Sequence, residues 1–544
     1  YTLSLHAALP ILQISGMSDT DIRIFLEAER VEHQDSPNAD VFDDAAITAL
    51  DLITGLRTGL ELDDAARCAS ALPHALSARD YRGAIDHAFE ASDLLPVNRS
   101  TEVEPQVKAH LAELLFESVS ADRYRPQPAH FTRAPKRRFV TRPAASLSLR
   151  DRVVYQALAD RASALLRGRL PASVLWPRPL VSSKDANSRF QSISDDWDTA
   201  YEVNADIESY FEYVDHSLLA YVLTTHVGLP TRTASAVETF LNTVMNSTRG
   251  LPQGPAASDV FATAYLLPLD LTLGERGWTS ARYQDDLKVA ATGVADAKNT
   301  LRELEATLRE FGLRLSQDKS YYVSLKNRVK KDKGYSTAPA QERAGEAKAS
   351  RDSIRTGDLL AEFRALSAQV FNKSSDPRVK RAESRLGAIL TELAAGTGAG
   401  LGRELSTALD WFPQLAPEAA QYLGQRYSER PEDVSEFIQF RLKERREQDW
   451  ENAWLVLAPD LSDRNLQPDL RGVLMAASRD ESLPPLTRCN ALKVLVRRGG
   501  LVDTTDPAWI RGIPDPLVSE LALETQQWGT AGWGFLALGS DSST

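Results

Sequence analysis

Apolar and polar residues alternate from Tyr201 to Asp206, and this period of two predicts a half-buried β-strand that ends in an aspartate on its polar face. Residues 281–291 form two short apolar segments on either side of Asp285 and Asp286. That arrangement predicts a β-hairpin with the acidic pair at its turn. The pattern therefore places three carboxylates at the ends of extended segments.

Turns and helical spacing connect these segments. Gly250–Pro255 predicts a rigid turn, and a helix is expected over residues 256–267. Ala295–Phe311 carries an apolar stripe and should end at Gly312. A short strand over Leu313–Leu315 completes the order strand, helices, hairpin, helix, strand, which is a βαββαβ unit with its carboxylates on one surface.

The N-terminal flank divides into two parts. Tyr1–Ile11 resembles a translated sequencing adapter and lacks the positive start of a signal peptide. We therefore expect residues 1–16 to be a non-native leader and Met17 to be the first native residue. Residues 17–122 form an acidic, helical N-terminal region with helical spacing over Ile22–Ala28, Ala45–Leu60, Tyr81–Leu95 and Val107–Val119.

Beyond residue 350 the pattern becomes a succession of apolar-striped helices with short Gly, Pro or Asp breaks. Their spacing in pairs every ~40 residues predicts an all-α, HEAT-like repeat domain over residues 350–544. We expect Trp411, Trp450 and Trp454 to lie in its core rather than to stack on nucleic acid. The expected helices are Leu359–Val370, Arg378–Ala394, Gly402–Trp411, Pro417–Arg426, Val434–Lys443, Trp450–Leu457, Asp469–Ser478 and Pro485–Arg498.

Composition limits the class of protein. The 544 residues, 25% of them charged, are typical of a soluble globular chain of about three domains. Two cysteines, Cys68 and Cys489, exclude a disulfide framework and a zinc cluster and favour a cytoplasmic location. No apolar run reaches the ~18 residues that a membrane span needs, so we expect no membrane association.

The charge of the chain is unevenly distributed. A net charge of −12 argues against indiscriminate nucleic-acid binding, but basic residues cluster over 123–142, with interleaved aromatic residues, and over 326–333. Taken alone, each run is equally well a solvated linker. Beside the three carboxylates at the strand ends, a track for phosphate groups becomes the better interpretation.

The three aspartates suggest a specific chemistry. Two like charges side by side are unfavourable unless water or a cation neutralises them. An aspartate at a strand end beside an Asp-Asp hairpin can hold two divalent ions about 4 Å apart. Such a pair serves nucleotidyl transfer, in which charge neutralisation and positioning supply most of the catalysis. We therefore expect Asp206, Asp285 and Asp286 to bind Mg²⁺, with Mn²⁺ as a substitute.

Four motifs in order resemble those of reverse transcriptases. Asp206-Ile-Glu-Ser-Tyr-Phe is similar to motif A, Leu251-Pro-Gln-Gly-Pro to motif B, Tyr283-Gln-Asp-Asp to motif C and Leu315-Ser-Gln-Asp-Lys-Ser to motif D. Upstream, Arg142-Pro143 and residues 149–158 resemble the first fingers blocks of bacterial members. The resemblance covers roughly residues 130–330. It implies an α+β polymerase right hand, with a βαββαβ palm and fingers over residues 123–340.

The resemblance also implies roles for individual residues. The Ile207 carbonyl would be a further metal ligand, and Lys319 would lie near the triphosphate and protonate the leaving pyrophosphate. An aromatic ring after Asp206 would exclude a 2′-hydroxyl; the candidates are Tyr210 and Phe211, with Tyr210 preferred on spacing. Further nucleotide-binding candidates are Gln253, Gly254, Tyr283 and the fingers cations Lys184 and Arg189. Nucleic-acid contacts are expected from Arg137, Arg138, Arg142, Arg150, Arg152, Lys330 and Lys331.

The flanks suggest a subgroup. The sequence has no HNH nuclease signature, no zinc-binding tail and no RNase H-like carboxylate set after the palm. A palm followed by helical repeats resembles the abortive-infection and "unknown group" defence reverse transcriptases of bacteria, some of which extend DNA without a template from a protein tyrosine. The implied partners are an RNA template or a DNA product, dNTPs and further copies of the chain.

Two alternatives remain at this stage. One is a retron-type or group II intron-type reverse transcriptase. The other is a catalytically inactive palm that serves as a nucleic-acid-binding scaffold. The intact aspartates argue against the scaffold, because carboxylates at a buried edge carry a desolvation cost.

Overall fold

The computed structural model describes residues 64–88, 94–96, 105–136, 140–176, 183–325, 348–369, 377–395, 400–499, 512–514 and 516–518. The expected leader and the helices expected at Ile22–Ala28 and Ala45–Leu60 lie outside these residues. The chain divides into two compact units, Tyr1–Ala66 and Arg67–Thr544, and the description below concerns the second. Among the described residues, no helix has both the length and the apolar character needed to cross a bilayer.

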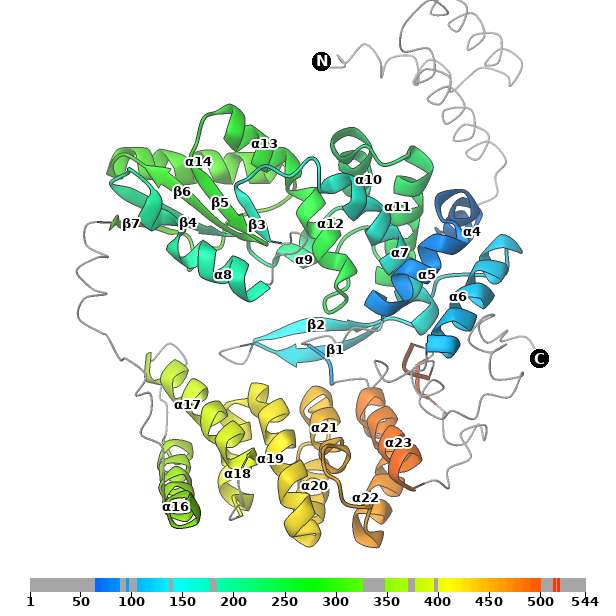
Figure 1. The fold of residues 1–544 in the computed structure, drawn as a ribbon, viewed down its shortest axis with the longest axis vertical. Coiled ribbons are helices and arrows are strands. Elements are labelled where there is room, and N and C mark those ends of the chain that lie inside the picture. Colours follow the sequence, from blue (N-terminus) through cyan, green and yellow to red (C-terminus); the bar gives the residue numbers. More distant parts are fainter. Residues whose placement is uncertain are drawn as a thin grey trace, which may run out of the picture. The chain divides into compact units, whose positions relative to one another are not determined.

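A five-stranded sheet with the strand order β3-β5-β6-β4-β7 carries the three aspartates (Figure 1). Neighbours from β5 to β7 are antiparallel, and β3 runs parallel to β5 at one edge. The expected βαββαβ order is therefore present, with β3 added. The strands are β3 (Val174–Trp176), β4 (Tyr201–Asp206), β5 (Ser280–Tyr283), β6 (Asp286–Ala291) and β7 (Tyr321–Ser324).

Helices connect and cover the sheet. Helix α14 contacts β4, β6 and β7, and it ends where Gly312 adopts a positive φ of 69°, as its sequence predicts. The elements between β3 and β5 are α8 (Ser183–Ser192), η4 (Ile193–Asp196), α9 (Tyr210–Tyr213), α10 (His216–Val222), η5 (Leu223–Val227), α11 (Thr231–Met245), α12 (Ala257–Tyr265) and α13 (Leu267–Glu275), and α14 (Val294–Glu310) follows β6.

Two expectations for the palm are wrong. The strand expected at Leu313–Leu315 contributes only an isolated bridge between Ile207 and Leu315, and the last strand is β7. The expected exposed polar face of β4 is also absent, because Glu202 is 3% and Asp206 is 8% exposed. Glu202 tolerates burial through an ion pair of 3.5 Å with Lys288, which is equally buried.

The described N-terminal helices belong to the core of the palm. Helices α4 (Asp64–Ala75), α5 (Ala78–Ala88) and α6 (Pro105–Ser120) share one hydrophobic cluster with α7 (Leu149–Leu166) and the palm helices. Helix α7 begins at Ser148, whose hydroxyl accepts a hydrogen bond of 3.1 Å from the Asp151 amide, an N-cap. The expected boundary near residue 122 is therefore not a boundary of the core.

A hairpin forms where the sequence suggested a basic linker. Strands β1 (His130–Pro135) and β2 (Thr141–Ser146) pair antiparallel, from His130 opposite Ser146 to Pro135 opposite Thr141. Ala134 and Ala144 of this hairpin belong to a second hydrophobic cluster, whose other members come from residues 359–518.

The C-terminal region consists of helices at the positions that the apolar stripes predict. Helices α17, α19, α21 and α23 contact one another in succession, and so do α16, α18, α20 and α22, which gives two layers (Figure 1). Trp450 and Trp454 are buried, as expected, and Trp411 packs against the same cluster. The helices are α16 (Lys348–Ser367), α17 (Pro377–Ala394), α18 (Gly402–Trp411), α19 (Ala416–Glu429), α20 (Pro431–Glu444), α21 (Asp449–Leu455), α22 (Pro468–Arg479) and α23 (Pro485–Gly499), with η6 (Pro413–Leu415) and η7 (Ala458–Leu461) between them.

Candidate active site

The pairing of β4 with β6 brings the motif A and motif C aspartates together. Asp206, the last residue of β4, lies directly opposite Asp286, the first residue of β6. Gln284 and Asp285 form the turn between β5 and β6, and Gln284 adopts the left-handed conformation with φ 52°. The acidic pair thus lies at the hairpin turn, as its sequence predicts.

The site raises the pKa of both motif C carboxyls. Desolvation raises the pKa of Asp286 to about 6, and the charges of Asp285 and Asp206 act in the same direction. Desolvation and the Asp206 charge also raise the pKa of Asp285. Because each carboxylate is disfavoured by the others, the site gains stability from any cation that enters it.

Lys319 supplies one such cation. Its Nζ donates a hydrogen bond of 2.8 Å to Asp206 Oδ1, although its side chain is 68% exposed. Desolvation lowers the Lys319 pKa, but the hydrogen bond to Asp206 and the charges of the three aspartates outweigh it and raise the pKa. The motif D turn is held nearby, since the Ser316 amide donates to the Asp206 carbonyl at 2.8 Å.

The chemical type of the ligand atoms at this site suits a hard divalent cation. Among the described residues, no three His, Cys, Asp or Glu side chains already converge as a metal cluster. The three aspartates nevertheless supply carboxylate oxygens, the ligands that Mg²⁺ and Mn²⁺ prefer. The raised pKa values of Asp285 and Asp286 and the ammonium on Asp206 indicate an excess of negative charge that a metal ion would neutralise. The expected ligand Ile207 is buried beside them.

The motif B turn joins the palm to the hairpin. The Gln253 carbonyl accepts a hydrogen bond of 2.9 Å from the Ala145 amide of β2. Gly254 adopts a φ of 127°, which side-chain-bearing residues rarely adopt. The Ser258 hydroxyl of α12 donates a hydrogen bond of 2.5 Å to the Pro252 carbonyl. Gln253 and Gly254 are half-buried at this junction.

The hairpin brings two cations to the aspartates. Lys136 and Arg142, which lie close to the turn of the hairpin, both interact electrostatically with Asp285. Desolvation lowers the pKa of each, and Lys136 is further opposed by Arg142. Arg142 Nε is buried and has no hydrogen-bond partner. An unsatisfied guanidinium donor beside a catalytic centre requires an acceptor that a phosphate group could provide.

Tyr210 is wrongly placed for the preferred sugar-gate role. It is 2% exposed, and its hydroxyl donates to the Ala262 carbonyl of α12 inside the core. Phe211 is half-buried beside it, with ring centroids 5.7 Å apart. Phe211 is therefore the aromatic residue of the pair that remains available to a ligand.

The other expected nucleotide-binding residues lie on or against α8. Lys184 and Arg189 are exposed on this helix, and Arg189 forms an ion pair of 2.7 Å with Asp196. Tyr283 is half-buried, with its ring 6.0 Å from that of Phe190.

The expected nucleic-acid contacts divide into three groups. Arg137, Arg138, Lys330 and Lys331 lie outside the described residues. Arg150 is 5% exposed, with its guanidinium 5.9 Å from the Tyr124 ring centroid, so it is badly placed to bind an external phosphate. Arg152 is half-buried, and Arg142 lies at the aspartates instead.

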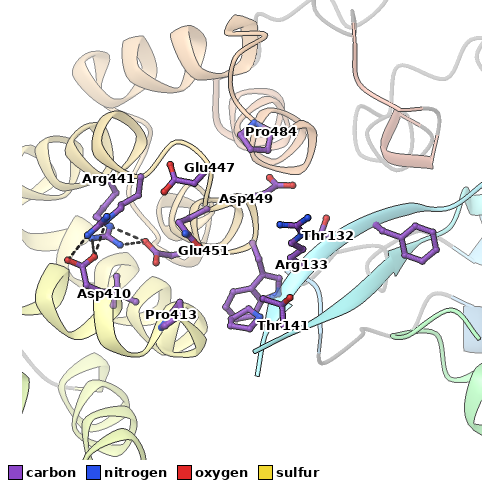
Figure 2. A pocket seen from close by; sticks show the side chains of 16 residues that line it. Thr132, Arg133, Thr141, Asp410, Pro413, Arg441, Glu447, Asp449, Glu451 and Pro484 are labelled. Carbon is purple, nitrogen blue, oxygen red and sulfur yellow. Dashed lines mark hydrogen bonds and ion pairs between the residues drawn. The ribbon is translucent and has the colours of Figure 1, made fainter. Parts of the chain in front are cut away.

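A separate cavity of about 620 Å³ lies between the hairpin and the C-terminal helices. Figure 2 shows Thr132 and Arg133 on the hairpin side and Asp410, Arg441 and Glu451 on the other. Arg441 is buried and donates to Glu451 Oε1 at 2.5 Å and to Asp410 Oδ1 at 2.9 Å. The Thr132 hydroxyl is buried without a hydrogen-bond partner.

The antiparallel sheet, with carboxylates at the adjoining ends of β4 and β6, has the arrangement that the four sequence motifs imply for a palm. Residues 134–372 match the model of the reverse transcriptase (RNA-dependent DNA polymerase) family. The match supports a reverse transcriptase domain over this segment and, with it, RNA-directed DNA polymerase activity. The matched segment extends past the motifs into α16.

Among solved structures, the chain is similar to telomerase from Candida albicans in complex with a TWJ fragment of telomeric RNA. The identity is 11% and the TM-score 0.28, over 64% of this chain and 68% of that one. It is also similar to apo telomerase from Candida tropicalis, with 12% identity and a TM-score of 0.28 over 61% and 68%. A comparison with curated proteins gives no match.

Proposed function

We propose that Asp206, Asp285 and Asp286 form the catalytic centre of a two-metal DNA polymerase that uses dNTPs. The proposal rests chiefly on the register of β4 and β6, which sets Asp206 opposite Asp286 with Asp285 in the adjoining turn. When bound, two Mg²⁺ or Mn²⁺ ions would activate the primer 3′-hydroxyl and neutralise the triphosphate. The Ile207 carbonyl would be a further ligand.

Basic residues around the aspartates would bind the phosphate groups. Lys136 and Arg142 come from the hairpin and Lys319 from the motif D turn, so the triphosphate would be held from two sides. Lys319 would release Asp206 when a metal ion binds and would then protonate the leaving pyrophosphate. Gln253, Gly254 and Tyr283 would shape the nucleotide pocket, with Phe211 under the sugar.

The C-terminal helices would complete the path for nucleic acid. Their two layers favour a HEAT-like array, and the hairpin packs into the same hydrophobic cluster. We infer that the array replaces a thumb over an RNA template or a growing DNA strand, with further copies of the chain assembled around it. Arg152 and the basic residues near 137 and 330 would contact the sugar–phosphate backbone of the nucleic acid.

The biological setting that fits this architecture best is bacterial antiphage defence in the cytoplasm, of the abortive-infection or "unknown group" type. What supports it is a palm joined to a helical array. A retron-type or intron-type enzyme is the alternative, and dependence on an added template distinguishes the two.

The test is incorporation of labelled dNTPs by the purified full chain with Mg²⁺ or Mn²⁺. The reaction is run with and without nuclease treatment of the protein, and with an added RNA template. Wild type should extend DNA, and Asp285→Ala should be inactive with an unchanged circular dichroism spectrum. More than a trace of incorporation by Asp285→Ala would overturn the assignment of the metal site, and an inactive wild type would favour the scaffold alternative.

A further inference from the structure

Arg282 is a buried cation directly beneath the motif C turn. It lies in β5 and is 1% exposed, and none of the metal-, nucleotide- or nucleic-acid-binding roles described above involves it. Its Nε donates to Asp270 Oδ1 at 2.8 Å and its Nη2 to Asp270 Oδ2 at 2.5 Å, a two-pronged contact with α13. Asp270 is itself 2% exposed. The pair therefore fixes the end of β5 to the helix behind it.

The remaining guanidinium nitrogen reaches the catalytic turn. Arg282 Nη1 donates a hydrogen bond of 2.8 Å to the carbonyl of Gln284. Gln284 precedes Asp285 and has a φ of 52°, a conformation that residues with a side chain adopt only when their surroundings impose it. The Arg282 contact is such a constraint, because it holds the carbonyl of the strained residue from inside the protein.

The same arginine is connected to the other motifs. Its Nη2 also lies 3.4 Å from the Thr263 carbonyl of α12, the helix that follows the motif B turn. The neighbouring Ala262 carbonyl accepts the hydrogen bond of the Tyr210 hydroxyl, from motif A. Motifs A, B and C thus meet at one helix, and Arg282 is the charged member of the connection.

We propose that Arg282, oriented by Asp270, is the positioning residue for the catalytic carboxylates of Asp285 and Asp286. A buried ion pair contributes little net stability, and its best-attested use is to specify one arrangement. Here it fixes the left-handed turn, so that both carboxylates are presented together to a divalent cation. The proposal rests on the metal-dependent function proposed above and assigns the support behind that site.

The central test is Arg282→Lys in the full chain. Lysine can keep a charge contact with Asp270, but one ammonium cannot reproduce the fork and also hold the Gln284 carbonyl. We expect Mn²⁺ affinity, measured from the paramagnetic resonance signal of free Mn²⁺, to weaken by about tenfold or more. We expect kcat to fall by a similar factor while the KM for dNTP stays within about threefold.

A second variant separates positioning from general damage. Glycine adopts a φ near 52° without strain, so Gln284→Gly added to Arg282→Lys should recover about threefold or more of the lost Mn²⁺ affinity. Glu202→Gln is the matched control, because it disrupts a different buried ion pair of the same sheet, the one between Glu202 and Lys288. It should lower the unfolding temperature and leave Mn²⁺ affinity unchanged. If Arg282→Lys does not fold, Asp270→Asn takes its place with the same measurements.

Three outcomes would overturn the positioning role. They are wild-type Mn²⁺ affinity in the Arg282 variant, no recovery with Gln284→Gly, and an equal loss of Mn²⁺ affinity in Glu202→Gln. These are distinct from failure of the proposed function, which would appear as a wild-type chain that neither binds Mn²⁺ nor incorporates dNTPs.

Discussion

Lys319 Nζ lies 2.8 Å from Asp206 Oδ1, so an ammonium group occupies a carboxylate that the proposed mechanism assigns to a metal ion. A metal ion that binds this carboxylate withdraws its negative charge and so weakens its attraction for the ammonium. Metal binding should therefore release the Lys319 ammonium toward the substrate, where it can act as an acid.

Lys319→Ala should slow the chemical step, because a positioned general acid typically contributes on the order of 10²-fold or more. Single-turnover incorporation measures that step directly, and dNTP affinity should change less. Since the Lys319 pKa is raised, the group stays protonated at neutral pH, and its contribution to stability is lost only as the pH rises through that raised value. Single-turnover rates equal to wild type would reject the role.

Asp286→Asn should have opposite effects on stability and activity. The pKa of Asp286 in the folded state is raised to about 6, so the ionised carboxylate opposes folding. The free energy of unfolding therefore falls as the pH rises from the pKa of the unfolded state through about 6. In metal-free buffer at pH 7.5, the asparagine variant should therefore unfold at a higher temperature than wild type. It should also lose the stabilisation that Mg²⁺ gives to wild type, together with polymerisation. Thermal unfolding with EDTA and with Mg²⁺ measures both effects; a lower metal-free unfolding temperature would contradict the expected repulsion.

Phe211→Ala should admit ribonucleotides, because it removes the half-buried ring after motif A. Tyr210→Phe is the control. It removes a hydroxyl bonded to the Ala262 carbonyl and should cost about 1 kcal/mol of stability without changing sugar choice. The ratio of dNTP to rNTP incorporation decides between them. Unchanged discrimination in Phe211→Ala would remove the gate hypothesis.

Lys136→Ala and Arg142→Ala should each raise the KM for dNTP by about tenfold, since each removes a cation that faces Asp285. Lys184→Ala and Arg189→Ala provide matched controls on α8, where both side chains are exposed. Steady-state kinetics over a range of dNTP concentrations measure the difference. A larger effect from the α8 variants would restore the original assignment of the triphosphate to Lys184 and Arg189.

Removal of the helices after Ser350 should abolish processive synthesis and self-association. The hairpin loses its packing partners in that truncation, because Ala134 and Ala144 lie in the cluster formed by residues 359–518. Light scattering of the full chain and product length on a gel are the measurements. A monomeric full chain would contradict the assembly, and a fully active truncated palm would contradict the contribution of the array.

The sequence predicted the parts of this fold that depend on local pattern. Asp285 and Asp286 lie at a hairpin turn, and Gly402–Trp411 is a helix with the expected bounds, because short-range periodicity and turn residues determine both. The motifs also identified Asp206 and Lys319, although their contact crosses 113 residues.

The errors concern contacts between distant segments. Tyr210 was preferred as the gate on spacing alone, but its hydroxyl finds a carbonyl 52 residues away in the core. Arg150 lies in the segment that resembles a fingers block and was expected to contact nucleic acid, yet it is buried beside Tyr124. The role of Arg142 changed because the hairpin folds back to the aspartates, which no local pattern indicates. The role of Arg282 could not be predicted from the sequence, because a lone arginine in a strand becomes informative only when its partners are known.

The shared cluster of hairpin and array has a consequence for synthesis on the ribosome. Residues 130–146 emerge early, while the helices that cover Ala134 and Ala144 are translated more than two hundred residues later. A nascent chain that already contains all four motifs would still lack the helices that pack against the hairpin of Lys136 and Arg142. We infer that the hairpin gains this support only after residues 359–518 have been translated, so that its two cations are held in place later than the aspartates are.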